Sequence, residues 1–177
     1  MIRIKGDIKM KKRIAALLFA SVLLLSTCNN SDDQALKVDG TGTEATTVDL
    51  EKTYNSMVSA AADGTPEMSI MDEDMMLNLC GIKSEDISTA FVSVCSDSLR
   101  ADEIWVIEAK DKAALDRITE LANKRITAKD EESITYSPEQ NKIVKNGQII
   151  IKGNYFALIV SPDVDAMAKI FKNAVGA

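Results

Sequence analysis

The stretch from Gln148 to Ser161 restricts the possible folds of this chain most. It contains two runs of strongly β-forming residues, Gln148 to Lys152 and Tyr155 to Ser161, separated only by Gly153 and Asn154. A two-residue link of this kind between two such runs predicts a tight β-hairpin. Because a tight hairpin joins antiparallel strands, the chain is expected to contain an antiparallel sheet.

A second pair of strands is predicted upstream. Thr89 to Cys95 and Ile104 to Ala109 each alternate in the manner of a strand, and the polar link Ser96 to Glu103 predicts that they form a hairpin. The alternation places Trp105 on the opposite side of its strand from Glu108. We expect Trp105 to lie in the core, and the alternative is an exposed ring that anchors a binding patch.

Apolar residues at helical spacing predict four helices. The first spans Leu50 to Ala62, and the second runs from Asp72 to Cys80, where Gly81 ends it. The third begins at Asp111, and the fourth begins at Ser161-Pro162-Asp163 with proline at its first position. The apolar stripes of the last two helices comprise Leu115, Ile118, Leu121, Ala122 and Ile126, and Val164, Met167, Ala168, Phe171 and Val175.

The segment between the third helix and the second hairpin is predicted to be a polar loop that contains Pro138. The turn signal Asn146-Gly147 leaves open an additional strand at Lys142 to Lys145. The element order is therefore two helices followed by strand-strand-helix twice. This order predicts an α+β domain in two layers, with a four-stranded antiparallel sheet and helices packed mainly on one face.

The N-terminal region has the pattern of a secretory signal. A basic cluster from Lys9 to Arg13 precedes the uncharged apolar run Ile14 to Leu25. This run has 12 residues, whereas a membrane-spanning helix needs about 20. We therefore predict a signal peptide at residues 1–27, with a start at Met1 or Met10.

The cysteine after the apolar run indicates how the signal ends. Leu25-Ser26-Thr27-Cys28 resembles a bacterial lipobox, in which a cysteine is acylated before the preceding bond is cleaved, although Thr27 departs from the usual glycine or alanine. We predict cleavage between Thr27 and Cys28 and lipidation of Cys28. Acyl chains on Cys28 would anchor the protein in the cell membrane, facing the extracytoplasmic side. The alternative is a free cysteine at the end of an apolar segment.

The predicted mature chain has two parts. Residues 28–46 are polar with isolated apolar side chains, so we expect a flexible tether there. Residues 47–177 are expected to form a single α+β domain with one core.

The charge of the chain argues against nucleic acid as a partner. The whole chain has a formal net charge of −6, and residues 1–27 carry six basic residues against one acidic residue, so the mature protein would carry −11. Binding to nucleic acid depends on lysine and arginine side chains that neutralise phosphates. No basic stripe with interleaved aromatic residues is visible in the sequence.

The residue types present provide no recognisable catalytic centre. The chain has no histidine, which excludes nucleophile systems that depend on a histidine base. Its acidic clusters have ordinary explanations as solvated turns and, in one case, as the acidic first turn of a helix rather than a calcium loop. These clusters are Asp102-Glu103, Asp130-Glu131-Glu132 and Asp72-Glu73-Asp74. We therefore predict no catalytic residue, no cofactor and no metal ligand.

Two cysteines remain in the predicted mature chain beyond the lipidation position. Cys80 and Cys95 each lie at the end of an apolar element, which is typical of a buried thiol. A disulfide between them is the alternative.

Five short stretches occur in a characteristic order along the chain. They are Leu77-Asn-Leu-Cys-Gly81-Ile82, Ala101-Asp-Glu-Ile104, Ala109-Lys-Asp111, Tyr136-Ser-Pro138-Glu-Gln140, and Gly153-Asn154-Tyr155 before an apolar strand and Ser161. By their order and spacing they resemble an uncharacterised family of lipoproteins from Gram-positive bacteria, the domain of unknown function 4358, over nearly all of residues 48 to 175. The resemblance implies a lipid-anchored extracytoplasmic domain, and it identifies no functional residues.

Two functions of different class follow as hypotheses. The favoured one is a non-catalytic envelope lipoprotein that binds an envelope protein or a cell-wall component through a sheet face or edge. The alternative is a carboxylate-dependent hydrolase of envelope polymers, which would need acidic residues that converge in a concave pocket. A receptor for a small solute is a weaker third hypothesis, because little chain is available for two lobes around a cleft.

Overall fold

The structure is a computed structural model that describes residues 47–61 and 66–176. The described residues all belong to one unit, Glu44–Ala177. The predicted signal peptide and tether, with Thr27 and Cys28, lie outside the described residues, as does Ala62 at the end of the first predicted helix. The elements are α1 Leu50–Val58, β1 Met68–Ile70, α2 Glu73–Met75 continued by a π-helical turn at Met76–Cys80, a 3₁₀ turn at Ser84–Asp86, β2 Ile87–Cys95, β3 Glu103–Ala109, α3 Lys112–Tyr136, α4 Pro138–Lys145, β4 Gln148–Lys152, β5 Tyr155–Val160 and α5 Val164–Val175.

The predicted antiparallel sheet is confirmed, but it has five strands in the order β1-β2-β3-β5-β4. Both predicted hairpins are present, and the β4–β5 turn has Gly153 at a φ of 59°. The prediction of four strands is wrong because it omits β1, which pairs with the end of β2 from Met68 opposite Cys95 to Ile70 opposite Ser93. A strand of three residues is too short to show the alternation by which strands are recognised.

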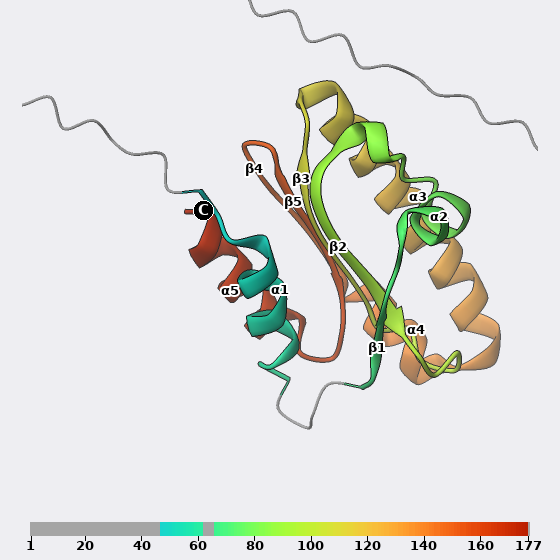
Figure 1. The fold of residues 1–177 in the computed structure, drawn as a ribbon. Helices are drawn as coiled ribbons and strands as arrows, with labels where there is room; N and C mark the ends of the chain where they lie inside the picture. Colours follow the sequence, from blue (N-terminus) through green and yellow to red (C-terminus); the bar gives the residue numbers. More distant parts are fainter. Residues whose placement is uncertain (1–46, 62–65, 177) are drawn as a thin grey trace, which may run out of the picture. The chain divides into compact units, whose positions relative to one another are not determined.

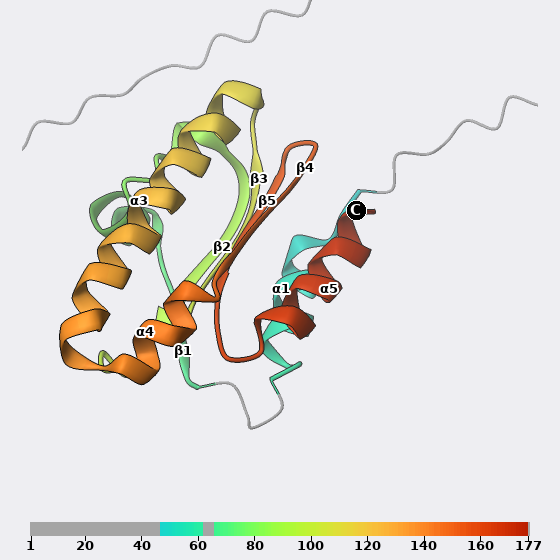
Figure 2. The same cartoon turned by 180° about the vertical axis from the view of Figure 1, so that it is seen from behind.

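Helices cover both faces of the sheet, so the prediction of helices mainly on one face is also wrong. Figure 1 shows α1 and α5 side by side on one face, with α3 on the other. Figure 2, seen from behind, shows α3 running along the second face of the sheet, with α4 near one end of α3. The central strands explain this arrangement, because every residue of β3 except Glu108 and every residue of β5 except Tyr155 is buried. Strands with buried residues on both sides need cover on both faces.

The helices on the two faces enclose two separate apolar cores, so the predictions of two layers and of one core are wrong. The core beneath α3 contains Trp105 and Ile107, and the core beneath α1 and α5 contains Ile104 and Val106. Trp105 has 0% of its surface exposed, and its ring lies 6.4 Å from that of Phe156. The core interpretation of Trp105 is therefore confirmed.

The region around Pro138 is helical rather than a loop. The third helix extends to Tyr136, and α4 begins at Pro138 after the single residue Ser137. The Ser137 hydroxyl accepts a hydrogen bond from the Gln140 backbone N–H at 3.3 Å, which caps α4. The possible strand at Lys142 to Lys145 is wrong, because these residues form the end of α4. Serine followed by proline favours the start of a helix. This explains why the segment is helical and is neither a loop nor a strand.

Candidate functional site

The acidic pair at the start of β3 lies in the interior of the domain. Asp102 is 2% exposed and Glu103 is 0% exposed, so the prediction of a solvated turn is wrong at both residues. A buried carboxylate is costly unless cations and hydrogen-bond donors compensate it. The groups around these two side chains therefore determine what this part of the protein can do.

Glu103 is the centre of a buried network of charged groups. Its Oε1 accepts a hydrogen bond from Trp105 Nε1 at 2.7 Å. Arg125 Nη2 lies 3.0 Å from Oε2, and Lys129 Nζ lies 2.9 Å from the same oxygen. Two cations and one indole N–H thus compensate a single carboxylate, and the cations exceed the carboxylate by one positive charge.

The local structure explains why these groups meet. Glu103 and Trp105 are two residues apart on β3 and therefore point to the same face of the sheet. Arg125 and Lys129 are four residues apart on α3, so they lie on one face of that helix. Because α3 packs on the face that Trp105 occupies, the four side chains converge in the interior.

Asp102 is compensated by a separate ion pair. Arg100 Nε donates to Asp102 Oδ2 at 3.0 Å, and Arg100 Nη2 donates to Oδ1 at 3.4 Å. This hydrogen bonding raises the pKa of the Arg100 guanidinium above its ordinary value. A third buried acid, Asp86, accepts from Arg117 Nε at 3.1 Å, and the bonds from Arg117 lower the pKa of Asp86. Each of these three buried acidic side chains therefore has an arginine partner.

A pocket of about 390 Å³ opens beside the ion pairs, and we call it the corner pocket. Its walls come from the link between β2 and β3 and from the junction of α3 with α4. Gln140 Oε1 accepts a hydrogen bond from the Ala101 backbone N–H at 2.8 Å and so joins the two walls. Its lining includes Leu99, Arg100, Ala101, Lys129, Glu132, Tyr136 and Gln140.

The corner pocket brings together two of the stretches that carry the family resemblance. Ala101 opens the stretch before β3, and Tyr136 to Gln140 span the junction of α3 and α4. The hydrogen bond between Ala101 and Gln140 joins residues 39 positions apart in the chain. A site assembled from two separate stretches of sequence is what a binding pocket on a folded scaffold requires.

The floor of the corner pocket offers hydrogen-bond donors. Lys129 Nζ uses two of its three N–H groups on Glu103 and on the Ala101 carbonyl, the latter at 3.0 Å. Arg100 keeps its remaining guanidinium N–H groups, and 37% of its side chain is exposed. The Gln140 amide nitrogen is also left to donate, because only the amide oxygen bonds to Ala101.

The rim of the corner pocket has a different character. Leu99 is 83% exposed and Tyr136 is 84% exposed, so both present apolar surface to solvent. Glu132 also lines the pocket, and its carboxylate interacts electrostatically with Arg125. The predicted loop at Asp130-Glu131-Glu132 is wrong, because all three residues lie within α3.

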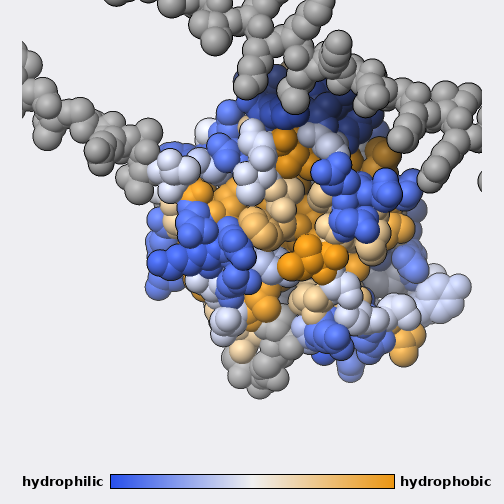
Figure 3. All heavy atoms as spheres, viewed as in Figure 1, coloured by the Kyte–Doolittle hydropathy of each residue, from blue (hydrophilic) through white to orange (hydrophobic). Residues whose placement is uncertain are grey.

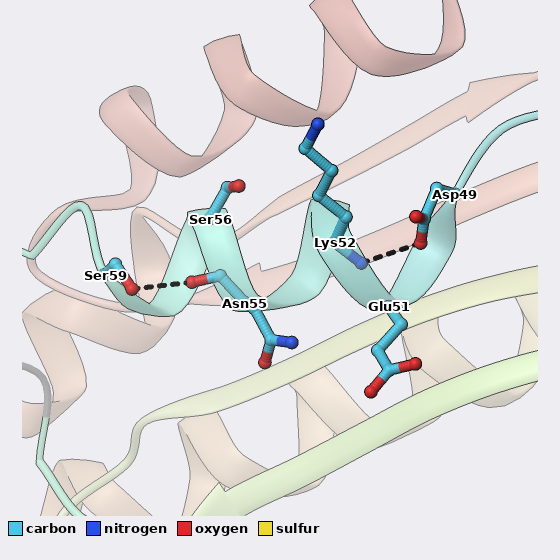
Figure 4. Close-up of a pocket in the computed structure, with 6 residues that line it drawn as sticks. All are labelled: Asp49, Glu51, Lys52, Asn55, Ser56 and Ser59. Carbon is cyan, nitrogen blue, oxygen red and sulfur yellow. Dashed lines mark hydrogen bonds between the residues drawn. The ribbon is translucent and has the colours of Figure 1, made fainter.

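A second hollow, of about 430 Å³, lies along α1 but lacks these features. Figure 4 shows that its side chains project along the surface of this one helix. Asp49 accepts a hydrogen bond from the Lys52 backbone N–H at 2.9 Å as the helix cap, and Ser59 Oγ donates to the Asn55 carbonyl at 2.8 Å. Capping and helix termination explain these polar groups, so this hollow is not a candidate site.

Apolar surface is also present at the sheet edge. Figure 3 shows hydrophobic residues in the middle of the face seen in Figure 1, between hydrophilic residues on both sides. Ile70 of β1 is 57% exposed, and β1 is an edge strand. Nothing in the described structure indicates what would cover this surface, so it supports no assignment.

The cysteines and the acidic helix start are structural. Cys80 and Cys95 are free and buried, which confirms the thiol interpretation over the disulfide. Burial raises the pKa of the Cys80 thiol to about 11, with the charge of Glu103 adding to the effect, so Cys80 is a poor nucleophile at neutral pH. Asp72 caps α2 by accepting from the Met75 backbone N–H at 2.8 Å. No group of three or more metal-ligating side chains is found among residues 47–61 and 66–176.

Comparison with known proteins gives one result. Neither the curated proteins nor the solved structures gave a match to this chain. None of the helices in the described ranges is long and apolar enough to cross a membrane. One family model matches residues 60–161, which is more than half of the chain and includes both walls of the corner pocket up to Gln140. The chain therefore belongs to the family defined by the domain of unknown function DUF4358.

Proposed function

We propose that this protein is a lipid-anchored, non-catalytic binding module that faces the extracytoplasmic side of the cell membrane and binds its ligand at the corner pocket. The observation that carries the proposal is the composition of this pocket. Donor groups on its floor lie beside exposed Leu99 and Tyr136 on its rim. Convergent polar groups combined with apolar surface are typical of a binding site.

The chemistry of the pocket favours binding over the alternative, a carboxylate-dependent hydrolase of envelope polymers. Glycoside hydrolysis normally uses two carboxyl groups on either side of the bond that is cleaved. Glu132 is the only acidic residue among those that line the corner pocket. Asp102 and Glu103, the nearby candidates, are buried and use their oxygens on Arg100, Arg125 and Lys129. A carboxylate in this position does not reach a substrate as acid or base.

The structure narrows the surfaces available for a partner. The hypothesis of binding through a sheet face loses its support, because helices pack on both faces of the described sheet. The corner pocket lies near α4, whereas the described chain begins beside α1, at the other side of the sheet in both views (Figures 1 and 2).

The anchor rests on the sequence pattern around Cys28 and gives the first testable prediction. In the Cys28→Ala variant the thiol that would be acylated is missing. We expect the variant to accumulate as uncleaved precursor or to leave the membrane fraction, because without acyl chains at residue 28 the protein has no lipid anchor. Fractionation of cells, with the parent protein and a Cys80→Ala variant as controls, measures this. Equal processing and equal membrane retention of the Cys28→Ala variant would exclude the anchor.

The binding role is tested by site-specific photocrosslinking on intact cells. A photoreactive residue in place of Tyr136, at the rim of the pocket, is expected to capture a defined envelope component. The matched control is the same residue in place of Ile134, which is 59% exposed on the same helix but does not line the pocket. Equal capture at both positions, or no capture at Tyr136, would contradict a binding role for the corner pocket.

A further inference from the structure

We propose that the corner pocket recognises the free carboxylate end of a short peptide. This inference rests on the proposed function of the pocket as a binding site and adds the chemical class of the ligand. The carboxylate would bind at the floor near Arg100 and Lys129, and the neighbouring part of the peptide would lie against the rim at Tyr136.

The charges around the floor balance. Arg100, Arg125 and Lys129 contribute three positive charges, and Asp102, Glu103 and Glu132 contribute three negative charges. Of these residues, Arg100, Lys129 and Glu132 line the pocket itself. The lining therefore offers two cations and one carboxylate, which suits a ligand that carries both an anionic group and an N–H donor.

The remaining donors match a carboxylate. Lys129 Nζ has one N–H left after its bonds to Glu103 and Ala101. Asp102 positions Arg100, which keeps free N–H groups on a half-exposed guanidinium. An arginine fork beside an ammonium group is suited to a carboxylate ligand. Because the ion pairs already fix both side chains, a ligand would need to order little of the floor.

Glu132 restricts the type of anion. Its carboxylate lines the same pocket, so a ligand with two negative charges would be repelled. A ligand with one carboxylate and a nearby N–H or ammonium group could instead bind Arg100 and Lys129 through its carboxylate and Glu132 through its N–H group. These are the groups at the end of a short peptide. Inorganic phosphate, which is a mixture of monoanion and dianion at neutral pH and carries no N–H group, is disfavoured by the same argument.

The rim and the size of the pocket fit the same ligand. The exposed ring of Tyr136 and the side chain of Leu99 offer apolar surface for a small peptide side chain. A volume of about 390 Å³ lies at the lower end of the usual range for small-molecule sites. It suits two or three small residues rather than an extended polymer.

Calorimetric titration of the purified protein with trialanine tests the inference. We expect trialanine with a free carboxylate to bind, and the C-terminal amide of the same peptide to bind about tenfold or more weakly, because a hydrogen-bonded charge is lost. Inorganic phosphate is the third probe and is expected to bind more weakly than trialanine.

Variants with matched controls locate the binding. Glu132→Gln is expected to reduce the preference for trialanine over phosphate, whereas the neighbouring Glu131→Gln is expected to leave it unchanged. Arg100→Gln is expected to weaken binding of trialanine by about tenfold. Because that variant also leaves Asp102 without its partner, Tyr136→Ala serves as a second test at an exposed position, with Ile134→Ala as its control.

Three results would overturn the proposal: equal binding of acid and amide, tighter binding of phosphate than of trialanine, or no binding of any probe to the folded protein. If trialanine fails while photocrosslinking at Tyr136 still captures an envelope component, the ligand class is wrong and the binding role stands. If both experiments fail, the corner pocket is not a binding site.

Discussion

Replacement of Glu103 by glutamine is expected to destabilise the domain by about 3 to 5 kcal/mol, because the substitution leaves two buried or half-buried cations without their carboxylate. The side chain of Glu103 is 0% exposed, and those of Arg125 and Lys129 are 27% and 13% exposed. Glutamine has almost the same shape as glutamate, so the decrease in stability would result from the missing charge and not from a change in side-chain volume. Denaturant unfolding followed by far-UV circular dichroism measures it.

Replacing all three charged side chains by apolar ones distinguishes two contributions to the free energy of unfolding: the penalty for leaving buried cations without a partner, and the net stabilisation that the intact network provides. The triple variant Glu103→Met, Arg125→Met, Lys129→Met removes all three charges together. Buried ion pairs replaced by apolar side chains of similar volume often cost little, so the triple variant is expected to be more stable than Glu103→Gln. A Glu103→Gln variant that unfolds like the parent would show that solvent reaches this network.

The second large effect is expected at Trp105. Trp105→Ala removes a fully buried ring between β2 and β5, where Val92 and Leu158 are its register partners. The resulting cavity is expected to cost about 3 to 5 kcal/mol of stability. The lost hydrogen bond from Nε1 to Glu103 adds to this effect. Chemical denaturation of the purified domain measures the change.

Two further variants make the Trp105 result specific. Trp105→Phe keeps most of the buried ring but loses the N–H, so its cost is expected to be smaller than that of alanine. Tyr136→Ala, at a position that is 84% exposed, is expected to change stability by about 0.5 kcal/mol or less. If Trp105→Ala melted like the parent but lost its envelope partner, Trp105 would belong to the binding site rather than to the core.

The hairpins were predictable from local sequence, and the number of layers was not. Gly153-Asn154 between two β-forming runs predicts the β4–β5 hairpin because the turn chemistry is local. The run Tyr155 to Val160 is apolar at every position, which is the signal of a strand buried on both faces. That signal indicates cover on both sides of the strand, but it does not specify which helices supply the cover.

The buried network had a signal in the pattern of α3. Leu115, Ile118 and Ala122 are buried along one stripe of this helix. The same spacing of three and four residues continues to Arg125 and Lys129, so the buried face ends in two cations. The carboxylate comes from Glu103, which lies on the same side of β3 as Trp105. The sequence alone does not show that these groups meet, because their contact depends on how α3 crosses the sheet.

The corner pocket could not be predicted from sequence. It exists because the link before β3 and the junction of α3 with α4 meet, and their contact depends on the packing of α3 across the sheet. The helix start at Ser137-Pro138 was visible, since serine before proline is a signal for a first turn. The position of Gln140 opposite Ala101 depends on tertiary structure, and no local pattern specifies it.

The single tryptophan gives this protein an internal optical reporter. Trp105 is the only tryptophan of the chain, and its N–H donates to the carboxylate that also binds Lys129. Lys129 in turn lines the corner pocket, and polar groups connected in this way polarise one another. A ligand that takes a hydrogen bond from Lys129 would therefore change the electric field at the indole, and the intrinsic fluorescence of the unlabelled protein would follow occupancy of the pocket.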